Sequence, residues 1–312
     1  MDAFFQMLRA AALFAALTVP GLILEKLKPS SDGGRTLGDL LQYAAMPSLV
    51  FTAVIGLDSA EAPGGLIAAA LIAPAVMTPI LLGLSRLLFG DPKARDDAKR
   101  AAAMCVIFPN CGFFGIPLAA AVFPGKPEVS LFVALYNVTS TVLYLTLGTA
   151  LISGKRDRKK ALRSVAGAPV IWATVLALIF VFTGLSRLSF VTDYSRALSG
   201  LCTPLAMISM GMSLARTGSG SRPPLREFAL VSSARLLVSP AVAVALSVPL
   251  QSFSFCAAML ISAGVSAAGS IPALFAKYRR DSRPGAVFAF GTALLSVLTL
   301  PALYEILTLI YK

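Results

Sequence analysis

The stretch Cys105–Phe123 constrains this chain more than any other, because it is apolar enough to cross a membrane yet carries several helix breakers. Pro109 precedes Asn110, and Gly115 stands two residues before Pro117. Proline removes a backbone donor and clashes with the preceding turn, while glycine weakens a helix by about 1 kcal/mol. In lipid, an unwound segment persists only where protein or a water-lined cavity satisfies its freed backbone groups. We therefore expect a broken membrane helix, an element that carries the binding site in many secondary transporters.

Composition places this helix in an all-α polytopic membrane protein. Of the 312 residues, 57% are hydrophobic and 13% are charged, against about 25% charged in soluble domains. Histidine is absent and the cysteines lie in apolar stretches without a CxxC pair, so we expect no metal site, no cofactor and no disulfide framework. The N-terminal apolar run lacks a basic start and a small-residue cleavage site, which favours a retained first helix over a cleaved signal peptide.

Ten apolar runs approach or exceed the roughly 20 residues that a membrane helix needs. They cover residues 3–24, 37–57, 64–89, 98–123, 128–152, 164–185, 194–214, 226–248, 253–277 and 285–310. The loops between these spans are short, so the sequence predicts no soluble domain.

The net charge of +12 follows the positive-inside rule and does not indicate nucleic-acid binding. The odd-numbered loops and their flanks hold 21 of the 27 Lys and Arg residues, and the even-numbered loops hold 3. Because cytoplasmic loops carry the excess of basic residues, we expect the odd-numbered loops in the cytoplasm and both termini outside. The alternation also supports ten spans, since a missed or extra helix would scramble it.

The two halves of the chain share short motifs in the same order, which predicts an inverted repeat. Pro74 in the third span matches Pro240 in the eighth, and Pro117 in the fourth matches Pro272 in the ninth. A Val-Leu pair begins 25 residues after Pro117 and 25 residues after Pro272, at 142 and at 297. The sequence therefore predicts two five-helix repeats of opposite orientation.

The central basic loop marks the boundary between these repeats. The predicted divisions are a first repeat at 1–152, a cytoplasmic loop at 153–163 and an inverted second repeat at 164–312. The ninth span is rich in small and hydroxylated residues at its centre, as expected for a partner of the broken fourth span. With a rise of 1.5 Å per residue, both breaks fall near the bilayer midplane, where the two spans are expected to cross.

These segments resemble the auxin efflux carrier family, within the superfamily of bile-acid and sodium symporters. Residues 108–118, FPNCGFFGIPL, are similar to the family's Pro-Asn-x4-Gly-Ile-Pro-Leu segment, and residues 273–278 resemble its Phe-Ala-Lys-x-Tyr ending. The likeness covers nearly the whole chain. It implies a scaffold of spans 1, 2, 6 and 7 and a mobile transport domain of spans 3–5 and 8–10. It also implies a homodimer that works by an elevator-like movement.

Two departures from the plant carriers leave the substrate and the coupling ion open. Their Asn-Pro-Asn near the start of the sixth span is replaced here by residues 166–169, AGAP, and the third span contains no acidic residue. The expected substrate is a small organic anion, with auxin-like acids and dicarboxylates as candidates, and proton or sodium coupling remains open. The plant family's long central loop is absent, which indicates a bacterial member in an inner membrane.

Asn110 is the leading candidate for binding the anion, since its plant counterpart helps to hold the substrate carboxylate. The alternative role is an N-cap of the half-helix that begins near Cys111. That half-helix N-terminus carries partial positive charge and free N–H groups, which suit an anion. The candidate binding residues are Asn110, Cys111, Gly112, Asn137, Ser266, Gly269 and Ser270. The residues expected to shape the breaks are Pro109, Gly115, Pro117, Gly264 and Pro272.

Several single residues keep two interpretations. Asn137 serves either as a hydrogen-bonding link between helices or as part of the site. Ser262, Ser266 and Ser270 are placed in the break of the ninth span, where a hydroxyl binds a ligand or its own helix. Arg235 is an intramembrane charge, which either snorkels to the cytoplasmic surface or, as we favour, pairs with helix-end carbonyls.

These features predict a secondary active transporter that moves a small organic anion by alternating access. A sodium-coupled cotransporter of the bile-acid type is the alternative within the same class. A membrane sensor with a transporter fold is less favoured, because no signalling domain is encoded. An intramembrane enzyme would need a nucleophile–base pair or metal ligands, and the spans carry no histidine or carboxylate cluster.

Overall fold

A computed structural model of the protein describes residues 2–28, 33–56, 62–90, 96–153, 158–216 and 224–311. These residues are almost wholly helical and include seven helices long and apolar enough to cross a membrane. The long helices are Phe4–Leu27, Thr36–Ile55, Gly64–Phe89, Pro127–Ser153, Ser189–Arg216, Leu225–Leu250 and Arg283–Ile310. Shorter apolar helices occupy Cys111–Val122, Pro169–Thr183 and Phe253–Gly264. The prediction of an all-α, multi-pass membrane protein is confirmed.

Many of these helices are built from consecutive shorter segments. In the first half they are α1 (Asp2–Ala16), α2 (Thr18–Leu27), α3 (Gly33–Leu40), η1 (Leu41–Ala45), α4 (Met46–Ile55), α5 (Gly64–Phe89), α6 (Asp97–Ile107), η3 (Cys111–Gly115), α7 (Ile116–Val122), α8 (Pro127–Leu143), η4 (Tyr144–Gly148) and α9 (Thr149–Ser153). In the second half they are α10 (Arg158–Ala166), α11 (Pro169–Thr183), η5 (Leu185–Arg187), α12 (Ser189–Ser199), α13 (Cys202–Arg216), α14 (Leu225–Ser233), η6 (Ala234–Val238), α15 (Ser239–Ser247), η7 (Val248–Leu250), α16 (Phe253–Gly264), α17 (Ile271–Lys277) and α18 (Arg283–Ile310).

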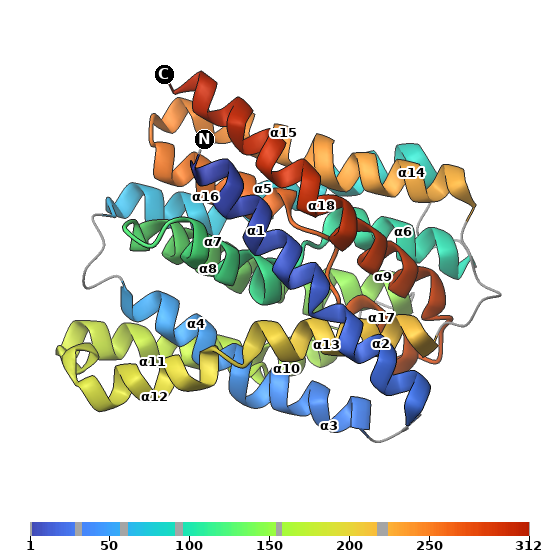
Figure 1. Ribbon diagram of the computed structural model, residues 1–312, viewed down its shortest axis with the longest axis horizontal. Helices are drawn as coiled ribbons and strands as arrows, with labels where there is room; N and C mark the ends of the chain where they lie inside the picture. The colour runs from blue at the N-terminus through green and yellow to red at the C-terminus, as the bar shows by residue number, and fades with distance from the viewer. Residues whose placement is uncertain are drawn as a thin grey trace.

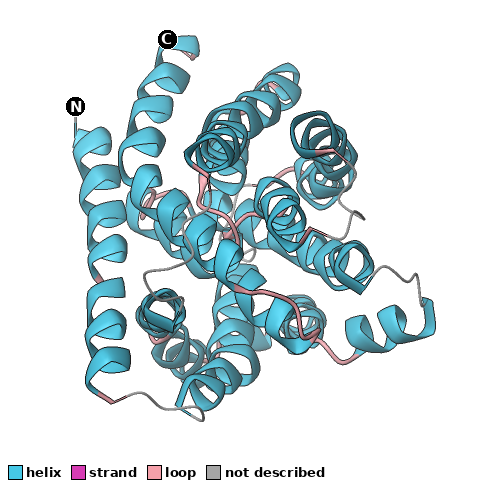
Figure 2. Ribbon diagram, turned by 90° about the vertical axis from the view of Figure 1, so that its right-hand side faces the viewer, coloured by secondary structure: helices cyan, strands magenta, loops and turns pink. Residues whose placement is uncertain are grey.

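The helices pack into two groups that lie one above the other in Figure 1. One group contains α2–α4 and α11–α13, in which α4 packs on α11 and α12, and α2 packs closely on α13. Helix α10 packs on η4. The other contains α5–α9 and α14–α18, with α5 on α8, α8 on α16 and α6 on α18. Helix α1 crosses from one group to the other, because it packs on α18 and α7 while α2 continues to α13. Figure 2 shows many of the helices nearly end-on, as one bundle.

Both chain termini lie toward the same end of the bundle. In Figure 1 they are at the upper left, and the α11–α12 turn lies at the left as well. The starts of α6 and α14 lie at the opposite, right-hand end.

Two predicted boundaries differ from the structure. Arg158 begins helix α10, so the second part of the predicted loop at 153–163 is helical, while residues 154–157 lie outside the described segments. The predicted span 194–214 consists of α12 and α13, which meet at Gly200. Asp58 and Glu61, which stand between the second and third predicted spans, lie outside the described part of the chain.

Candidate functional site

Two interrupted helices meet at the centre of the α5–α9 and α14–α18 group. Helix α6 ends at Ile107 and resumes as η3 at Cys111, while α16 ends at Gly264 and resumes as α17 at Ile271. Pro109 forms an antiparallel bridge with Ala267. The N–H of Asn110 donates to the Ser266 carbonyl at 2.8 Å, and the N–H of Ala268 donates to the Phe108 carbonyl at 2.9 Å. The unwound segments therefore satisfy part of each other's backbone, as a buried break requires.

The two breaks leave carbonyls at the end of each preceding helix without their helical donors, among them those of Val106 and Ala263. In a continuous helix the N–H of Asn110 would donate to Val106, four residues earlier, but it is bonded to Ser266 instead. The N–H of Ala267 would likewise donate to Ala263, but it donates to the Thr292 hydroxyl at 3.1 Å. The carbonyls of Val106 and Ala263 consequently need other donors.

Asn110 lies in the break with its side chain 3% exposed. It does not cap the half-helix, because its side chain accepts no hydrogen bond from the η3 backbone. Its Nδ2 has no acceptor among the described residues, and a Cβ added to Gly269 would lie 4.0 Å from it. The capping interpretation is therefore wrong for this side chain, and a buried amide donor remains available at the crossing.

The backbone that follows Asn110 adds further donors. The first N–H groups of a helix lack intrahelical partners, and those of Cys111, Gly112 and Phe113 donate to no other described residue. The Cys111 thiol donates to the Ser262 carbonyl at 3.1 Å, which ties the second half-helix to α16. The N-terminus of the segment Cys111–Val122 thus presents N–H groups and partial positive charge beside a free amide.

Asn137 comes from α8 and brings a second amide to the same place. Its side chain is 6% exposed, and its Nδ2 also lacks an acceptor among the described residues. A Cβ added to Gly112 would lie 3.1 Å from the Asn137 Oδ1, so this amide sits against the start of the half-helix. Both asparagines of the chain therefore lie beside the η3 N-terminus with unused donors. Among the described residues, no hydrogen bond makes Asn137 a link between helices.

The predicted serines occupy three different positions. Ser262 belongs to the last turn of α16 and not to the break, because α16 continues to Gly264. Ser266 lies in the break itself, and the buried hydroxyls of Ser262 and Ser266 have no hydrogen-bond partner within the described part of the chain. Ser270 immediately precedes α17. The hydroxyl of Tyr144 is buried and has no hydrogen-bond partner among the described residues.

The residues predicted to shape the breaks are glycines with little room for a side chain and prolines near the starts of helices. A Cβ on Gly264 would lie 2.8 Å from Leu300 Cδ2, and one on Gly115 would lie 3.3 Å from Val133. Pro272 stands in the first turn of α17, where an N–H has no intrahelical acceptor. Pro117 lies within the half-helix Cys111–Val122, directly after the π-helical turn η3. These residues shape the two half-helices and contribute no polar side chain to the crossing.

Arg235 is completely buried and does not snorkel to the surface. It projects from η6, and its Nη1 donates to the Val106 carbonyl at 3.0 Å. Its Nη2 donates to the Ala263 carbonyl and to the Ser239 hydroxyl. The favoured prediction of helix-end pairing is thus confirmed, because both carbonyls lie in the last turns of the interrupted helices α6 and α16.

Thr292 is a site residue that the sequence analysis missed. It is fully buried on α18, where its hydroxyl accepts from Ala267 and donates to Phe288 at 2.8 Å. Its position carries a recognisable signal: Thr292 follows Pro272 by the same interval as Asn137 follows Pro117. The two halves therefore place a polar residue at equivalent points behind their breaks.

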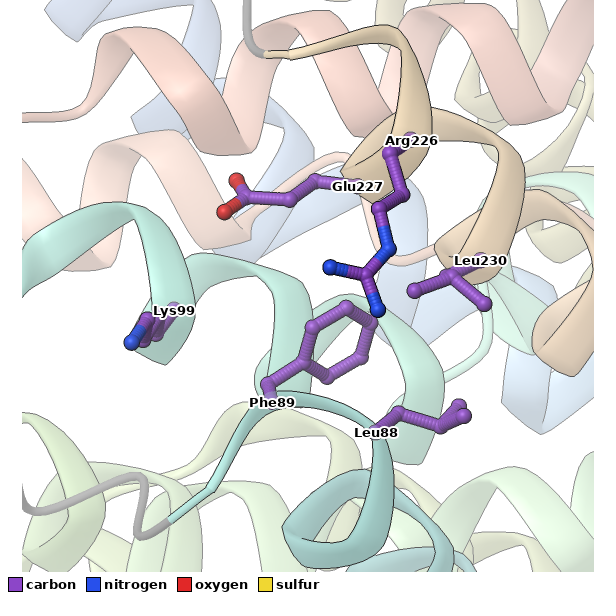
Figure 3. A pocket seen from close by; sticks show the side chains of 6 residues that line it. All are labelled: Leu88, Phe89, Lys99, Arg226, Glu227 and Leu230. Atoms are coloured by element: carbon purple, nitrogen blue, oxygen red, sulfur yellow. The ribbon is translucent and has the colours of Figure 1, made fainter.

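A separate cavity of about 260 Å³ lies between the end of α5, α6 and the start of α14. Its lining includes Lys99, Arg226 and Glu227 above an apolar floor. Figure 3 shows the Arg226 side chain reaching toward the ring of Phe89. None of the crossing residues lines this cavity, so it is distinct from the site built around Asn110.

Comparison with known proteins agrees with this architecture. The family model described as "Membrane transport protein" matches residues 26–304. An "Uncharacterized transporter" of Methanothermobacter thermautotrophicus is 30% identical over 241 residues, which is 74% of this chain and 75% of the relative. A second, from Methanocaldococcus jannaschii, is 28% identical over 232 residues, or 69% and 70% of the two chains. Both relatives are archaeal, so a bacterial inner membrane stays a prediction. The chain belongs to the membrane transport protein family, which confirms its resemblance to the auxin efflux carriers and makes it a multi-pass membrane transporter.

Proposed function

We propose that the chain crosses the membrane ten times, in two inverted five-helix repeats. The seven long helices account for seven crossings, and α6–α7, α11 and α16–α17 would supply the other three. An odd total is incompatible with termini at one end of the bundle. Gly112 lies beside Asn137 in the first repeat, and Ala267 lies beside Thr292 in the second. Ala267 follows Gly112 by 155 positions and Thr292 follows Asn137 by the same interval, which supports the repeat.

The proposed activity is secondary active transport of a small organic anion, with carboxylates as the substrate class. The carrying observation is the buried, unpartnered Nδ2 of Asn110 at the N-terminus of a half-helix. An unmade hydrogen bond of this kind costs roughly 1–3 kcal/mol, and a carboxylate oxygen would recover it. Asn137 and the free N–H groups of Cys111 and Gly112 supply further donors for the same oxygen atoms.

The charge around the crossing also favours an anion over a cation. The half-helix N-terminus is the positive end of its dipole, and the guanidinium of Arg235 lies against the ends of both helices that precede the breaks. The side chains gathered at the crossing are amides, hydroxyls and a thiol, without a carboxylate among the described residues. A cationic substrate would therefore meet no compensating negative side chain there.

The division of the helices supports the proposal of alternating access by an elevator-type movement. The proposed scaffold comprises spans 1, 2, 6 and 7, in which α2 packs on α13 and α4 packs on α11. The proposed transport domain comprises spans 3–5 and 8–10 and contains the whole crossing. Its movement would slide α7 and α18 along α1. The homodimer expected from the family resemblance stays a prediction.

The test is thermal stabilisation of the purified protein by a panel of small acids, with their amides as neutral analogues. A ligand at a hundredfold excess over its Kd raises the free energy of unfolding by about 2.7 kcal/mol. We expect one class of carboxylate to stabilise the wild type and to lose this effect in Asn110→Ala. Ser296→Ala is the matched control, because that buried hydroxyl is already bonded to Ala293 of its own helix.

The control variant should retain the acid-induced shift in full. An acid effect that survives Asn110→Ala would remove the crossing as the site. Stabilisation by neutral or cationic compounds, with no response to any acid, would overturn the organic-anion proposal and leave the family assignment intact.

A further inference from the structure

The ends of α6 and α16 form a site whose electrostatics suit a cation. The last carbonyls of a helix have no intrahelical partners and carry its partial negative charge. The carbonyls of Val106 and Ala263 are free because the N–H groups that would have paired with them are bonded elsewhere. Both carbonyls face the same guanidinium. In transporters with discontinuous helices, such ends and unwound carbonyls coordinate sodium or a proton.

This position is filled by the chain itself. The guanidinium of Arg235 donates to both carbonyls and to Ser239, and the residue is 0% exposed. Arginine keeps its proton inside proteins, so the positive charge is permanent. No carboxylate among the described residues pairs with Arg235, and the two helix ends and a hydroxyl are its only acceptors there. The nearby charge balance therefore depends on backbone dipoles.

We propose that Arg235 is a tethered cation that takes the place of a coupling alkali ion. Sodium would have to displace a guanidinium that is covalently held, bonded to both helix ends and shielded from water. The crossing therefore keeps its positive charge in every step of the transport cycle, and an anion binds beside it without sodium. The identity of that anion rests on the proposed function, whereas the occupation of the cation position does not.

Arg235 also links three helices of the proposed transport domain. Because Arg235 projects from η6, its bonds fix the α14–α15 helix to both half-helices. Removing the side chain would leave two carbonyls and the Ser239 hydroxyl without this donor, in a completely buried volume. A small cation that enters this volume should then restore part of the lost stability, as free guanidinium does when it replaces an arginine head group.

The test measures melting temperature without any acid present. We expect the wild type to melt at the same temperature in sodium chloride and in choline chloride of equal ionic strength. Arg235→Ala should melt several degrees lower, and millimolar guanidinium should raise its melting temperature by roughly 2 °C or more. The wild type should not respond to guanidinium, and urea at the same concentration should rescue neither protein.

Two further variants separate the charge from the packing. Ser239→Ala removes one hydrogen-bond partner but keeps the guanidinium, so it should lose stability without gaining a response to guanidinium or sodium. Arg235→Lys keeps the charge and should remain insensitive to sodium, and it provides the comparison if Arg235→Ala does not fold.

Sodium stabilisation of the wild type would overturn the proposal, and so would guanidinium rescue that is equal in the wild type and Arg235→Ala. These outcomes are independent of the acid panel. If no acid binds but the rescue is selective, the organic-anion function fails and the tethered cation stands. If an acid binds through Asn110 only in sodium, the tethered cation fails and the anion site stands.

Discussion

At the scale of single residues, Asn137 and Thr292 show how equivalent positions can take different roles. Each stands on the helix that follows a broken one, and each faces the backbone of the break. The Thr292 hydroxyl accepts a hydrogen bond from the N–H of Ala267 and donates one to the Phe288 carbonyl of its own helix. The Asn137 amide approaches Gly112 but keeps its Nδ2 unpaired. We infer that the second repeat uses this position to support the crossing, while the first leaves a donor for a ligand.

The supporting role of Thr292 can be tested with a nearly isosteric change. Thr292→Val should lower the free energy of unfolding by about 1–3 kcal/mol, because the N–H of Ala267 loses its acceptor inside a buried site. Thr292→Ser keeps the hydroxyl and should lie much closer to the wild type. Thermal denaturation in detergent measures both. Equal stability of the Val and Ser variants would mean that another group accepts from Ala267.

The sequence predicted part of this residue-level arrangement. The prolines and glycines located both breaks, and Arg235 stood out because an isolated charge in an apolar span needs partners. The free donor of Asn110 was not predictable, since an asparagine before a helix start is equally well explained as an N-cap. Distinguishing the two requires the side-chain geometry, which depends on how α16 crosses the break.

At the scale of helices, the closest packing joins α2 to α13. A Cβ added to Gly211 would run into the Thr18 carbonyl, and one added to Gly21 would run into the carbonyl of Ile208. Small residues at an interface let membrane helices approach closely and gain van der Waals contact. Glu25 and Arg216 add an ion pair with an N–O distance of 2.9 Å at the end of the same pair of helices. The proposed scaffold thus has a rigid seam.

Gly211→Ala should open this seam and lower the free energy of unfolding by about 1–3 kcal/mol, the usual cost of overpacking a close contact. The matched control is Gly83→Ala in the interior of α5, where an added Cβ meets nothing within 4 Å. There the higher helix propensity of alanine should leave stability unchanged or raise it by up to about 1 kcal/mol. Thermal or denaturant unfolding of both proteins gives the comparison. Similar effects of the two substitutions would contradict close packing at Gly211.

Helix boundaries were predicted less well than helix locations. The four π-helical segments of the described residues were missed. Three of them, η1, η3 and η6, directly precede a helix with proline at its second position: Pro47, Pro117 and Pro240. Proline clashes with the carbonyl four residues earlier, and the residue before each proline donates to a carbonyl five residues back. The widened turn accommodates the ring, and such bulges are frequent at functional sites. The signal was in the sequence, but apolar periodicity alone does not reveal it.

At the scale of the whole molecule, the predicted topology depends mainly on how Lys and Arg are distributed among the loops. The loops rich in Lys and Arg alternate with loops that nearly lack them. In the bundle, α6 and α14 begin at one end and the chain termini lie toward the other. Hydrophobicity could not have fixed this arrangement alone, because α11 and the half-helices are shorter than a typical span. The orientation of the bundle in the membrane stays a prediction of the positive-inside rule.

That orientation can be tested by cysteine labelling in intact cells. The four native cysteines are 0% exposed, so the folded wild type should not react with a membrane-impermeant maleimide. Gly125 lies in the exposed α7–α8 turn, where a Cβ meets nothing within 4 Å. Gly125→Cys should be labelled from outside, because this is a predicted even-numbered loop that is poor in basic residues.

Lys277→Cys is the opposite control, since this exposed position ends α17 beside a basic loop that is predicted to be cytoplasmic. It should be labelled only after the membrane is permeabilised. The ten-helix arrangement places an odd number of crossings between residues 125 and 277. Labelling of both positions from outside would mean an even number there and would contradict the arrangement. An exchange of the two results would keep ten crossings but reverse the orientation, which would mean that the basic loops are not cytoplasmic.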